Sequence, residues 1–199
     1  KELHSQGAQA IAIEADIADE SQVVRLFEAV DAEFGRLDAL VNNAGMLERQ
    51  MRLDNMDKAR LERVFAVNVF GSFLCAREAV KRMSTRHGGS GGAIVNVSSI
   101  AAKLGAPNEY IDYAAAKGAI DSMTLGLAKE VAAESIRVNA VRPGVIYTEI
   151  HASGGEPDRI ERVRSSVPMG RGGEALEVAE AILWLVSDKA SYTSGALLD

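Results

Sequence analysis

Tyr113 and Lys117 have the residue types and the spacing of an acid–base pair. They lie four positions apart, so on a helix their side chains project from the same side. A free tyrosine has a pKa of about 10, too high for a base at neutral pH, but a nearby ammonium group favours the phenolate and lowers that pKa. Two unrelated residues on a solvated helix face would show the same spacing. The residues between them, Ala114–Ala116, favour chemistry, because three small side chains let a flat ligand approach the helix closely.

Hydroxyl and amide side chains elsewhere in the chain are further candidates. Ser98 and Ser99 directly follow an apolar run. Hydroxyls at a strand end often only cap a turn, but one of them could polarise a carbonyl while Tyr113 donates or removes the proton. Asn68 lies inside a predicted helix, where asparagine is unfavourable because its amide competes for backbone hydrogen bonds. It is either a satisfied core amide or an amide whose carbonyl holds a water that connects Lys117 to solvent.

Other segments are candidates for contact with a bound molecule. Residues 42–45 (Asn-Asn-Ala-Gly) and Pro143-Gly144 each follow a predicted strand, so each is either a turn or a place where backbone approaches a cofactor. Asp16 either caps a turn or binds an adenine amino group. We assign Tyr110 to the wall of the substrate pocket. His151 is a possible substrate contact, although a lone histidine in a polar loop is more often solvated.

The elements that must position these residues follow from hydrophobic periodicity. The pattern predicts strands at 10–13, 37–41, 93–97, 136–141 and 195–198, and helices from a cap at Asp19 or Ser21 to residue 34, and at 57–83, 113–131 and 174–186. Residues 1–6 are predicted to end a helix, and 148–166 to form a mobile or partly helical flap. Strands alternating with helices predict an α/β fold of Rossmann type, a doubly wound parallel sheet with helices on both faces. We expect residues 1–199 to form one domain.

Composition narrows the class of protein. The chain has 199 residues, 47% hydrophobic and 25% charged, which is ordinary for a globular domain. A net charge of -6 gives no support to nucleic-acid binding. The single cysteine, Cys75, cannot form an internal disulfide. There is no apolar run of membrane-spanning length and no signal-peptide pattern, so we expect a cytoplasmic protein. We also expect no metal site.

Taken together and in order, these motifs resemble the classical short-chain dehydrogenase/reductase family, with sugar dehydrogenases and 3-oxoacyl reductases as the similar members. The resemblance covers essentially the whole chain. It rests on Asp16-Ile17, Asn42-Asn43-Ala44-Gly45, Asn68, Ser98-Ser99, Tyr113 with Lys117, and Pro143-Gly144 with Thr148.

The resemblance implies hydride transfer between NAD or NADP and a small alcohol or carbonyl compound. Tyr113 would be the acid/base, Lys117 would lower its pKa and hold the nicotinamide ribose, Asn68 would support the proton relay, and Ser99, the second serine of the pair, would be catalytic. The implied cofactor contacts are Asp16 and Ile17 to adenine, Asn43, Ala44 and Gly45 to the adjoining ribose region, and Pro143, Gly144, Ile146 and Thr148 to the nicotinamide.

The chain departs from the family pattern in two main respects. The glycine-rich loop of the family's first strand–helix unit does not occur in these 199 residues, and neither do the residues that choose between NAD and NADP. We therefore expect a domain that lacks its first unit, as a piece of a longer protein. A smaller departure is that Ser99 lies 14 positions before Tyr113, one more than the family pattern, which an extra loop residue within 107–111 would absorb.

A different class of function uses the same fold. A non-catalytic nucleotide sensor or interaction scaffold can lose the tyrosine or the lysine, so the presence of both favours an enzyme. The family resemblance also implies a homodimer or homotetramer that associates through the helices at 57–83 and 113–131. Apolar residues on more than one side of the second helix fit that arrangement.

Overall fold

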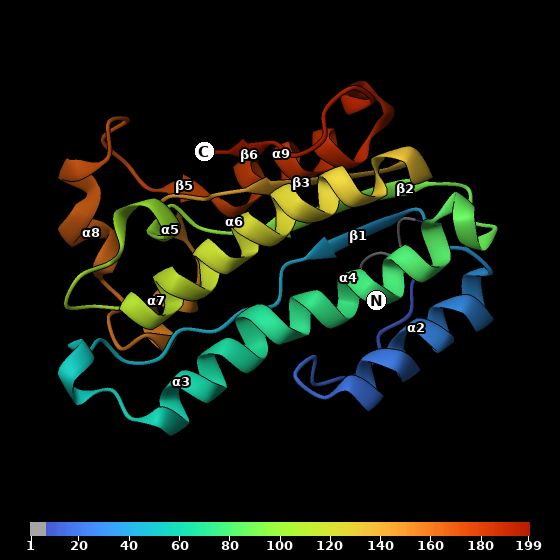
Figure 1. Cartoon of the computed structure of the whole chain (residues 1–199). Coiled ribbons are helices and arrows are strands. Elements are labelled where there is room, and N and C mark those ends of the chain that lie inside the picture. Colours follow the sequence, from blue (N-terminus) through green and yellow to red (C-terminus); the bar gives the residue numbers. More distant parts are fainter. Residues whose placement is uncertain (1–6) are drawn as a thin grey trace.

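A four-stranded parallel sheet forms the centre of the computed structural model, which describes residues 7–199 (Figure 1). The strands are β1 (Ala39–Asn42), β2 (Gly92–Val97), β3 (Ile136–Val141) and β6 (Leu197–Leu198), and they lie in the order β1-β2-β3-β6. Every neighbouring pair is parallel. The carboxyl ends of β1, β2 and β3 therefore meet at one edge of the sheet, where ligands bind in open α/β folds.

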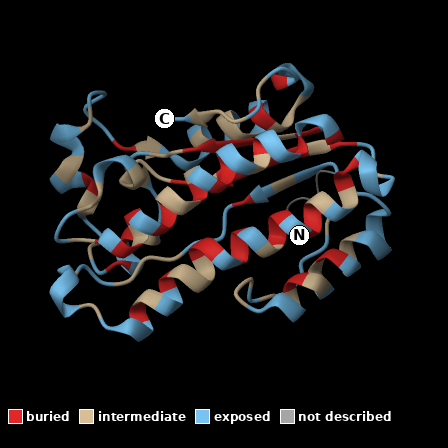
Figure 2. Ribbon diagram, viewed as in Figure 1, coloured by how far each residue is buried: buried red, intermediate tan, exposed pale blue. Residues whose placement is uncertain are grey.

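Helices cover both faces of this sheet, which confirms the predicted fold class. On one face, α2 (Glu20–Phe34), α4 (Ser72–Met83) and α6 (Ile111–Val131) pack against Ile94 and Val138. On the other face, α9 (Ala175–Val186) packs against Val95 and Val141. The adjacent β2 residues Ile94 and Val95 thus face opposite layers, as the pleat of a strand requires. Buried residues follow β2 and β3 and recur on α4 and α6 (Figure 2).

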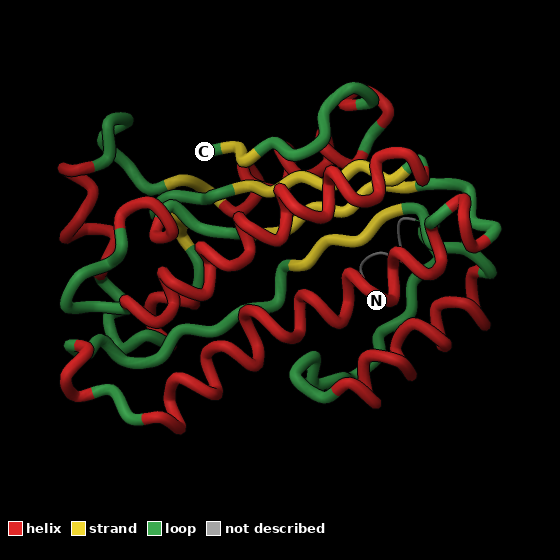
Figure 3. The backbone as a smooth tube through the Cα atoms, in the orientation of Figure 1, coloured by secondary structure: helices red, strands yellow, loops and turns green. Residues whose placement is uncertain are grey.

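The helix predicted at 57–83 is one continuous helical tube (Figure 3), and its winding changes in the middle. It consists of α3 (Lys58–Phe65), a π-helical turn at Ala66–Gly71, and α4. Asp57 caps its start, accepting a hydrogen bond from the backbone N–H of Arg60 at 2.8 Å. Such π turns insert one residue into a helix and occur frequently at functional sites. Asn68 lies inside this turn, which the sequence pattern did not predict.

The strand predicted at 10–13 is wrong. This segment has no regular secondary structure and forms no ladder with the strands of the described residues, and Ile11 and Ile13 are exposed. A run of apolar residues becomes a strand only where a neighbour accepts and donates the ladder hydrogen bonds. The predicted helix end at 1–6 lies outside the described residues. Strands β1 and β6 differ from the predicted 37–41 and 195–198 by two residues at their starts.

Short elements complete the chain. The predicted flap is partly helical, with α7 at Ile150–Ser153 and α8 at Arg159–Val163, and it is anchored by β4 (Ile146–Tyr147), which pairs with β5 (Gly173–Glu174). Helix α5 covers Ala101–Leu104, and 3-10 turns occur at Leu53–Asn55, Thr85–His87, Ala132–Glu134, Arg164–Ser166 and Asp188–Ala190.

No helix within residues 7–199 is both long enough and apolar enough to cross a membrane.

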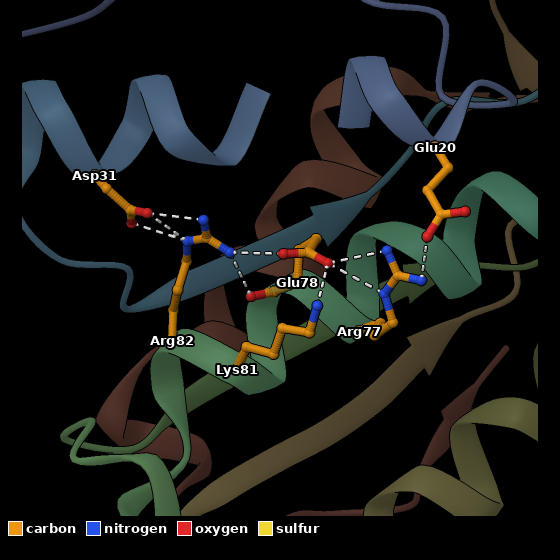
Figure 4. Close-up of polar contacts among 6 residues, drawn as sticks. All are labelled: Glu20, Asp31, Arg77, Glu78, Lys81 and Arg82. Carbon is orange, nitrogen blue, oxygen red and sulfur yellow. Dashed lines mark hydrogen bonds and ion pairs between the residues drawn. The ribbon is translucent and has the colours of Figure 1, made fainter. Parts of the chain in front are cut away.

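An ion-pair network attaches α2 to α4 (Figure 4). At its centre the Glu78 carboxylate, only 5% exposed, is hydrogen-bonded by Lys81 and Arg82. Burial alone would raise the pKa of Glu78, but the hydrogen bonds from its basic neighbours lower it. The network then reaches α2, because Arg82 pairs with Asp31 at 2.7 Å and Arg77 pairs with Glu20 at 2.6 Å.

Candidate active site

The edge formed by β1, β2 and β3 opens into a cavity of about 940 Å³. Residues that follow each of the three strands reach its wall, together with the side chain of Tyr113 from α6. The predicted site residues that line it are Asn43, Ser99, Tyr113, Pro143, Gly144, Ile146 and Thr148. The structure therefore brings together residues that are up to 105 positions apart in the sequence, from 43 to 148.

Lys117 is a buried cation beneath this cavity. The residue is 4% exposed, and its ammonium Nζ donates to the backbone oxygen of Val97 at 2.6 Å. Nζ lies 5.5 Å from the centre of the Tyr113 ring. Burial lowers the pKa of Lys117 from 10.5 to about 8, against the raising effect of Asp121. The lysine is thus close to the tyrosine, as the helical spacing predicts, and it is poised to lose its proton at mildly alkaline pH.

The pKa of Tyr113 is raised, whereas an adjacent lysine is expected to lower it. Burial raises the pKa of the phenol, while a hydrogen bond with Ser99 and the positive charge of Arg159 act to lower it. Removing a phenolate from water outweighs these favourable contacts. In the protein alone, Tyr113 is therefore a proton donor at neutral pH.

The two serines at the end of β2 have different environments. Ser98 is buried, and its hydroxyl donates to the backbone oxygen of Lys117 at 3.1 Å, so it fixes the helix to the strand. The hydroxyl of Ser99 accepts from the backbone N–H of Ala101 at 3.1 Å, and Ser99 lines the cavity together with Tyr113. Ser99 thus stands against the tyrosine at the cavity, although both serines follow the same strand.

Asn68 uses its side-chain amide for structural contacts. The carbonyl accepts from the backbone N–H of Met46 at 3.0 Å, and the amide nitrogen donates to the backbone oxygens of Met46 and Val64 at 3.0 and 2.9 Å. These bonds tie the loop after β1 to the π turn. Gly45 fits closely above them, because a Cβ there would lie 2.9 Å from the Asn68 carbonyl oxygen and 3.5 Å from Lys117 Nζ.

Asp16 and Ile17 lie apart from the main cavity. One carboxylate oxygen of Asp16 accepts from the backbone N–H of Ala18 at 2.9 Å, so the residue does cap a turn. Ile17 packs against Gly71 on the helical tube. A second cavity of about 230 Å³ is lined by Ile17, Asn43 and Ala44, among others, and Asn43 lines both cavities.

The two aromatic candidates near the flap are both buried. Tyr110 lies in the cavity wall, as predicted, and its hydroxyl accepts from Gln50 at 3.1 Å. The expectation that His151 is solvated is wrong. Its Nε2 donates to the backbone oxygen of Ile146 at 3.0 Å, and burial lowers the pKa of the ring. The flap folds onto the cavity, which places this histidine among its lining residues.

A buried ion pair that the sequence analysis missed holds the first turn of α6. Arg60 on α3 donates from Nε to Asp112 at 2.7 Å and from Nη1 to the backbone oxygen of Arg49 at 2.6 Å. The Asp112 carboxylate also accepts the backbone N–H of Tyr113 at 2.9 Å. Nothing in the local pattern distinguishes Arg60 from the surface arginines of the same helix, because its partner lies 52 positions away.

A second missed feature is a chain of amides inside the sheet. Asn42 donates to Asn96 on the neighbouring strand at 2.9 Å, and Asn96 donates to Thr124 on α6 at 2.9 Å. This chain locks β1, β2 and α6 together directly below the cavity edge. The sequence carried a signal for it, since asparagine is unusual in apolar strands and a buried amide needs partners.

Comparison with known proteins identifies the family of this chain. The family profile described as Enoyl-(Acyl carrier protein) reductase matches residues 1–199. The chain is 61% identical over 193 residues to the uncharacterized oxidoreductase YgfF of Escherichia coli, covering 97% of this chain and 78% of that protein. It is 37% identical over 198 residues to glucose and ribitol dehydrogenase of Daucus carota, covering 100% of this chain and 66% of the relative.

Solved structures of similar fold and sequence point to the same family. The 3-ketoacyl-(acyl-carrier-protein) reductase from Brucella melitensis complexed with NADH superimposes with a TM-score of 0.89 at 34% identity, covering 96% of this chain and 76% of the reductase. ElxO with NADP bound gives a TM-score of 0.84 at 34% identity, covering 94% and 74%. With a family match along all its residues and relatives well above 30% identity, this chain belongs to the short-chain dehydrogenase/reductase family.

Proposed function

We propose that the full-length protein transfers a hydride between NAD or NADP and a small alcohol or carbonyl compound, with Tyr113 as the acid/base. One observation carries this proposal: Tyr113, Ser99 and the buried Lys117 meet at the carboxyl edge of the sheet, beside a cavity of about 940 Å³. A phenol, a hydroxyl and a fixed cation at a ligand-sized opening can bind and protonate a carbonyl oxygen.

The residues around the cavity fit the nicotinamide half of such a cofactor. Lys117 donates one ammonium hydrogen to Val97, which leaves two donors for ribose hydroxyls. Gly45 lacks the Cβ that would lie 2.9 Å from the Asn68 carbonyl oxygen, so the loop after β1 packs closely against the π turn beside Lys117. The cavity wall against which a flat ring would lie contains Pro143, Gly144, Ile146 and Thr148.

The adenosine half would extend past Asn43 toward the second cavity. Asn43 lines both cavities, and Ala44 and Ile17 line the smaller one. Asp16 is exposed beside this region, where a carboxylate can accept from an adenine amino group. Relatives of similar structure bind either NADP or NADH, and we propose the same pair of alternatives here.

The chain's own groups have defined roles in this proposal. The bound nicotinamide supplies or accepts the hydride and, when oxidised, brings positive charge to the site. Ser99 donates a hydrogen bond to the substrate oxygen, and Tyr113 gives its proton to that oxygen during reduction or takes it during oxidation. Lys117 holds a positive charge beside the phenol, which favours the phenolate that reduction leaves behind. Asn68 holds the loop that carries Gly45 and would support the route by which the proton is replaced.

The test is the variant Tyr113→Phe in the full-length protein, assayed with NAD(P)H and a panel of ketones and aldoses. General acid catalysis contributes roughly 100- to 10,000-fold, so we expect kcat to fall by at least about 100-fold while cofactor binding, followed by fluorescence titration, is retained. Tyr192→Phe, which alters a fully exposed tyrosine, is the matched control. An undiminished rate in Tyr113→Phe would refute the role of Tyr113. Tight cofactor binding with no turnover of any substrate would favour a nucleotide sensor or scaffold.

A further inference from the structure

The flap places one basic side chain in the cavity wall near Tyr113. Arg159 is the first residue of α8, and among the described residues that line the cavity it is the only lysine or arginine. The cavity wall contains many apolar side chains, among them Leu47, Ile150 and Val163, and the flap also contributes the polar His151 and Ser166. A single guanidinium in this wall is a specific feature, because a partly buried charge needs a fixed partner, here Glu109.

Arg159 is held in place but keeps unused donors. Its Nη2 donates to Glu109 at 2.7 Å, and its guanidinium carbon lies 5.6 Å from the centre of the Tyr110 ring. Its Nε is buried without a hydrogen-bond partner, and no hydrogen bond of Nη1 occurs within residues 7–199. The side chain is 19% exposed. A guanidinium fixed by a carboxylate and an aromatic face loses little entropy on binding a second anion.

Glu109 does not depend on Arg159 alone. Arg162, one turn further along the chain, donates to the other oxygen of Glu109 at 2.8 Å and also pairs with Glu156. Glu109 therefore keeps a basic partner while Arg159 binds a further acceptor. The positive charge of Arg159 also reaches the reacting group, since it opposes the effect of burial on the pKa of Tyr113.

We propose that Arg159 binds a carboxylate of the substrate, and that the preferred substrate is a hydroxy or oxo acid with an apolar carbon skeleton between the reacting carbon and the carboxylate. A guanidinium matches a carboxylate in geometry and charge, and the apolar wall matches the skeleton. A polyol fits this wall less well, because each buried hydroxyl would need a partner that the apolar side chains cannot offer. The inference rests on the proposed function, in which Tyr113 reacts with the other end of the substrate.

The test compares an acid with its uncharged counterpart in the full-length protein. The probes are 4-oxocyclohexanecarboxylate, 4-methylcyclohexanone and an aldose, each reduced with NADPH or NADH. A hydrogen bond to a charged group contributes enough for roughly a 10- to 100-fold preference in kcat/KM, so we expect wild type to favour the acid by that factor. Arg159→Met should remove the preference: kcat/KM for the acid should fall at least about 10-fold more than kcat/KM for 4-methylcyclohexanone, because the lost positive charge near Tyr113 affects both substrates alike. Arg159→Lys, which keeps the charge but loses the fork, should fall between them.

Arg162→Met is the matched control. It removes a guanidinium from the same helix and from the same Glu109, but Arg162 is half exposed and does not line the cavity. We expect its ratio of acid to ketone turnover to equal that of wild type. If Arg162→Met changes the ratio as much as Arg159→Met, or if Arg159→Met slows both substrates equally, Arg159 only holds the flap and the proposal is overturned.

The outcomes separate this inference from the proposed function. A wild type that prefers 4-methylcyclohexanone or the aldose overturns the role of Arg159 and leaves the oxidoreductase function intact. Calorimetric binding of 4-methylcyclohexanecarboxylate, in the presence of cofactor, makes the same comparison without turnover. Binding that weakens about 10-fold or more in Arg159→Met, and not in Arg162→Met, supports the carboxylate site. Equal binding by wild type and Arg159→Met refutes it.

Discussion

At the scale of single residues, Lys117 carries an ammonium group that is buried away from water. Its surroundings favour the neutral amine, so burial lowers its pKa from 10.5 to about 8. The unfolded chain then holds a proton on Lys117 between about pH 8 and pH 10.5 that the folded chain has lost. Because the unfolded chain binds the extra proton, the free energy of unfolding rises with pH across this window. As the pH drops toward 8, this gain is lost, because the folded chain must again hold a buried ammonium.

We therefore predict that Lys117→Met changes the pH dependence of stability. A pKa lowered by about 2.5 corresponds to about 3 kcal/mol, so relative to the variant, wild type should gain about that much free energy of unfolding between pH 8 and pH 10.5. The measurement is urea denaturation of both proteins at several pH values from 7 to 10.5. Lys129→Met, an exposed lysine on the same helix, is the control and should follow wild type. Parallel curves for Lys117→Met and wild type would contradict the buried-ammonium account.

The residue scale is also where the sequence was most informative. The position of Tyr113 beside Lys117, facing the strand end at Ser98 and Ser99, could be predicted because helical spacing and a strand end follow from local pattern. The choice of Ser99 over Ser98 came from the family resemblance. The direction of the Tyr113 pKa could not be predicted, because it depends on the water removed by the flap and by neighbouring elements. His151 was misjudged for the same reason: a polar loop was taken to be solvated, whereas the folded flap buries it.

At the scale of elements, the start of α6 depends on a contact between two helices. Arg60 and Asp112 are both nearly fully buried, and Asp112 also accepts the backbone N–H of Tyr113. Buried ion pairs of this kind add little net stability over an apolar pair, but removing one partner leaves an uncompensated buried charge. The pair therefore acts chiefly to fix where α6 begins, and with it the position of Tyr113.

We predict strong coupling between these two residues in a double-mutant cycle. Arg60→Met leaves the Asp112 carboxylate buried without its cation and should lower the free energy of unfolding by about 3–5 kcal/mol. Arg60→Met with Asp112→Asn removes both charges but keeps an acceptor for the Tyr113 N–H, so it should be more stable than Arg60→Met alone. Urea denaturation of the four proteins measures the coupling. Additive losses would show that the two side chains act independently.

Element prediction failed where an element depends on a partner outside its own segment. Residues 10–13 have the continuous apolar run of a buried strand, but they form no ladder in the described residues, and Ile11 and Ile13 are exposed. The π turn at residues 66–71 is a second case, since the apolar pattern of 57–83 is helical on both sides of it. Asn68 marked the place, because asparagine is unfavourable inside a helix and its amide bonds both to Val64 and to the loop after β1.

At the scale of the whole molecule, α4 and α6 lie side by side on one face of the sheet (Figure 1). This face carries apolar side chains that the chain itself does not cover. Phe70 and Phe73 on the helical tube are 58% and 49% exposed, and Leu125 on α6 is also exposed. Two exposed phenylalanines three positions apart are neighbours on a helix surface, and contiguous apolar patches of this kind commonly mark protein–protein contacts. We therefore expect two copies of the protein to associate through α4 and α6.

Phe73→Glu tests this arrangement at the centre of the patch. A buried aromatic anchor contributes about 2 kcal/mol or more to an interface, and a carboxylate placed there would remain uncompensated when two copies meet. We expect sedimentation velocity at micromolar protein to show dimers or tetramers for wild type and a shift toward monomers for Phe73→Glu. Leu53→Glu is the control, because Leu53 is also exposed, at 60%, but lies in the 3-10 turn before α3. Monomers in the wild type, or an identical shift in both variants, would argue against association through this face.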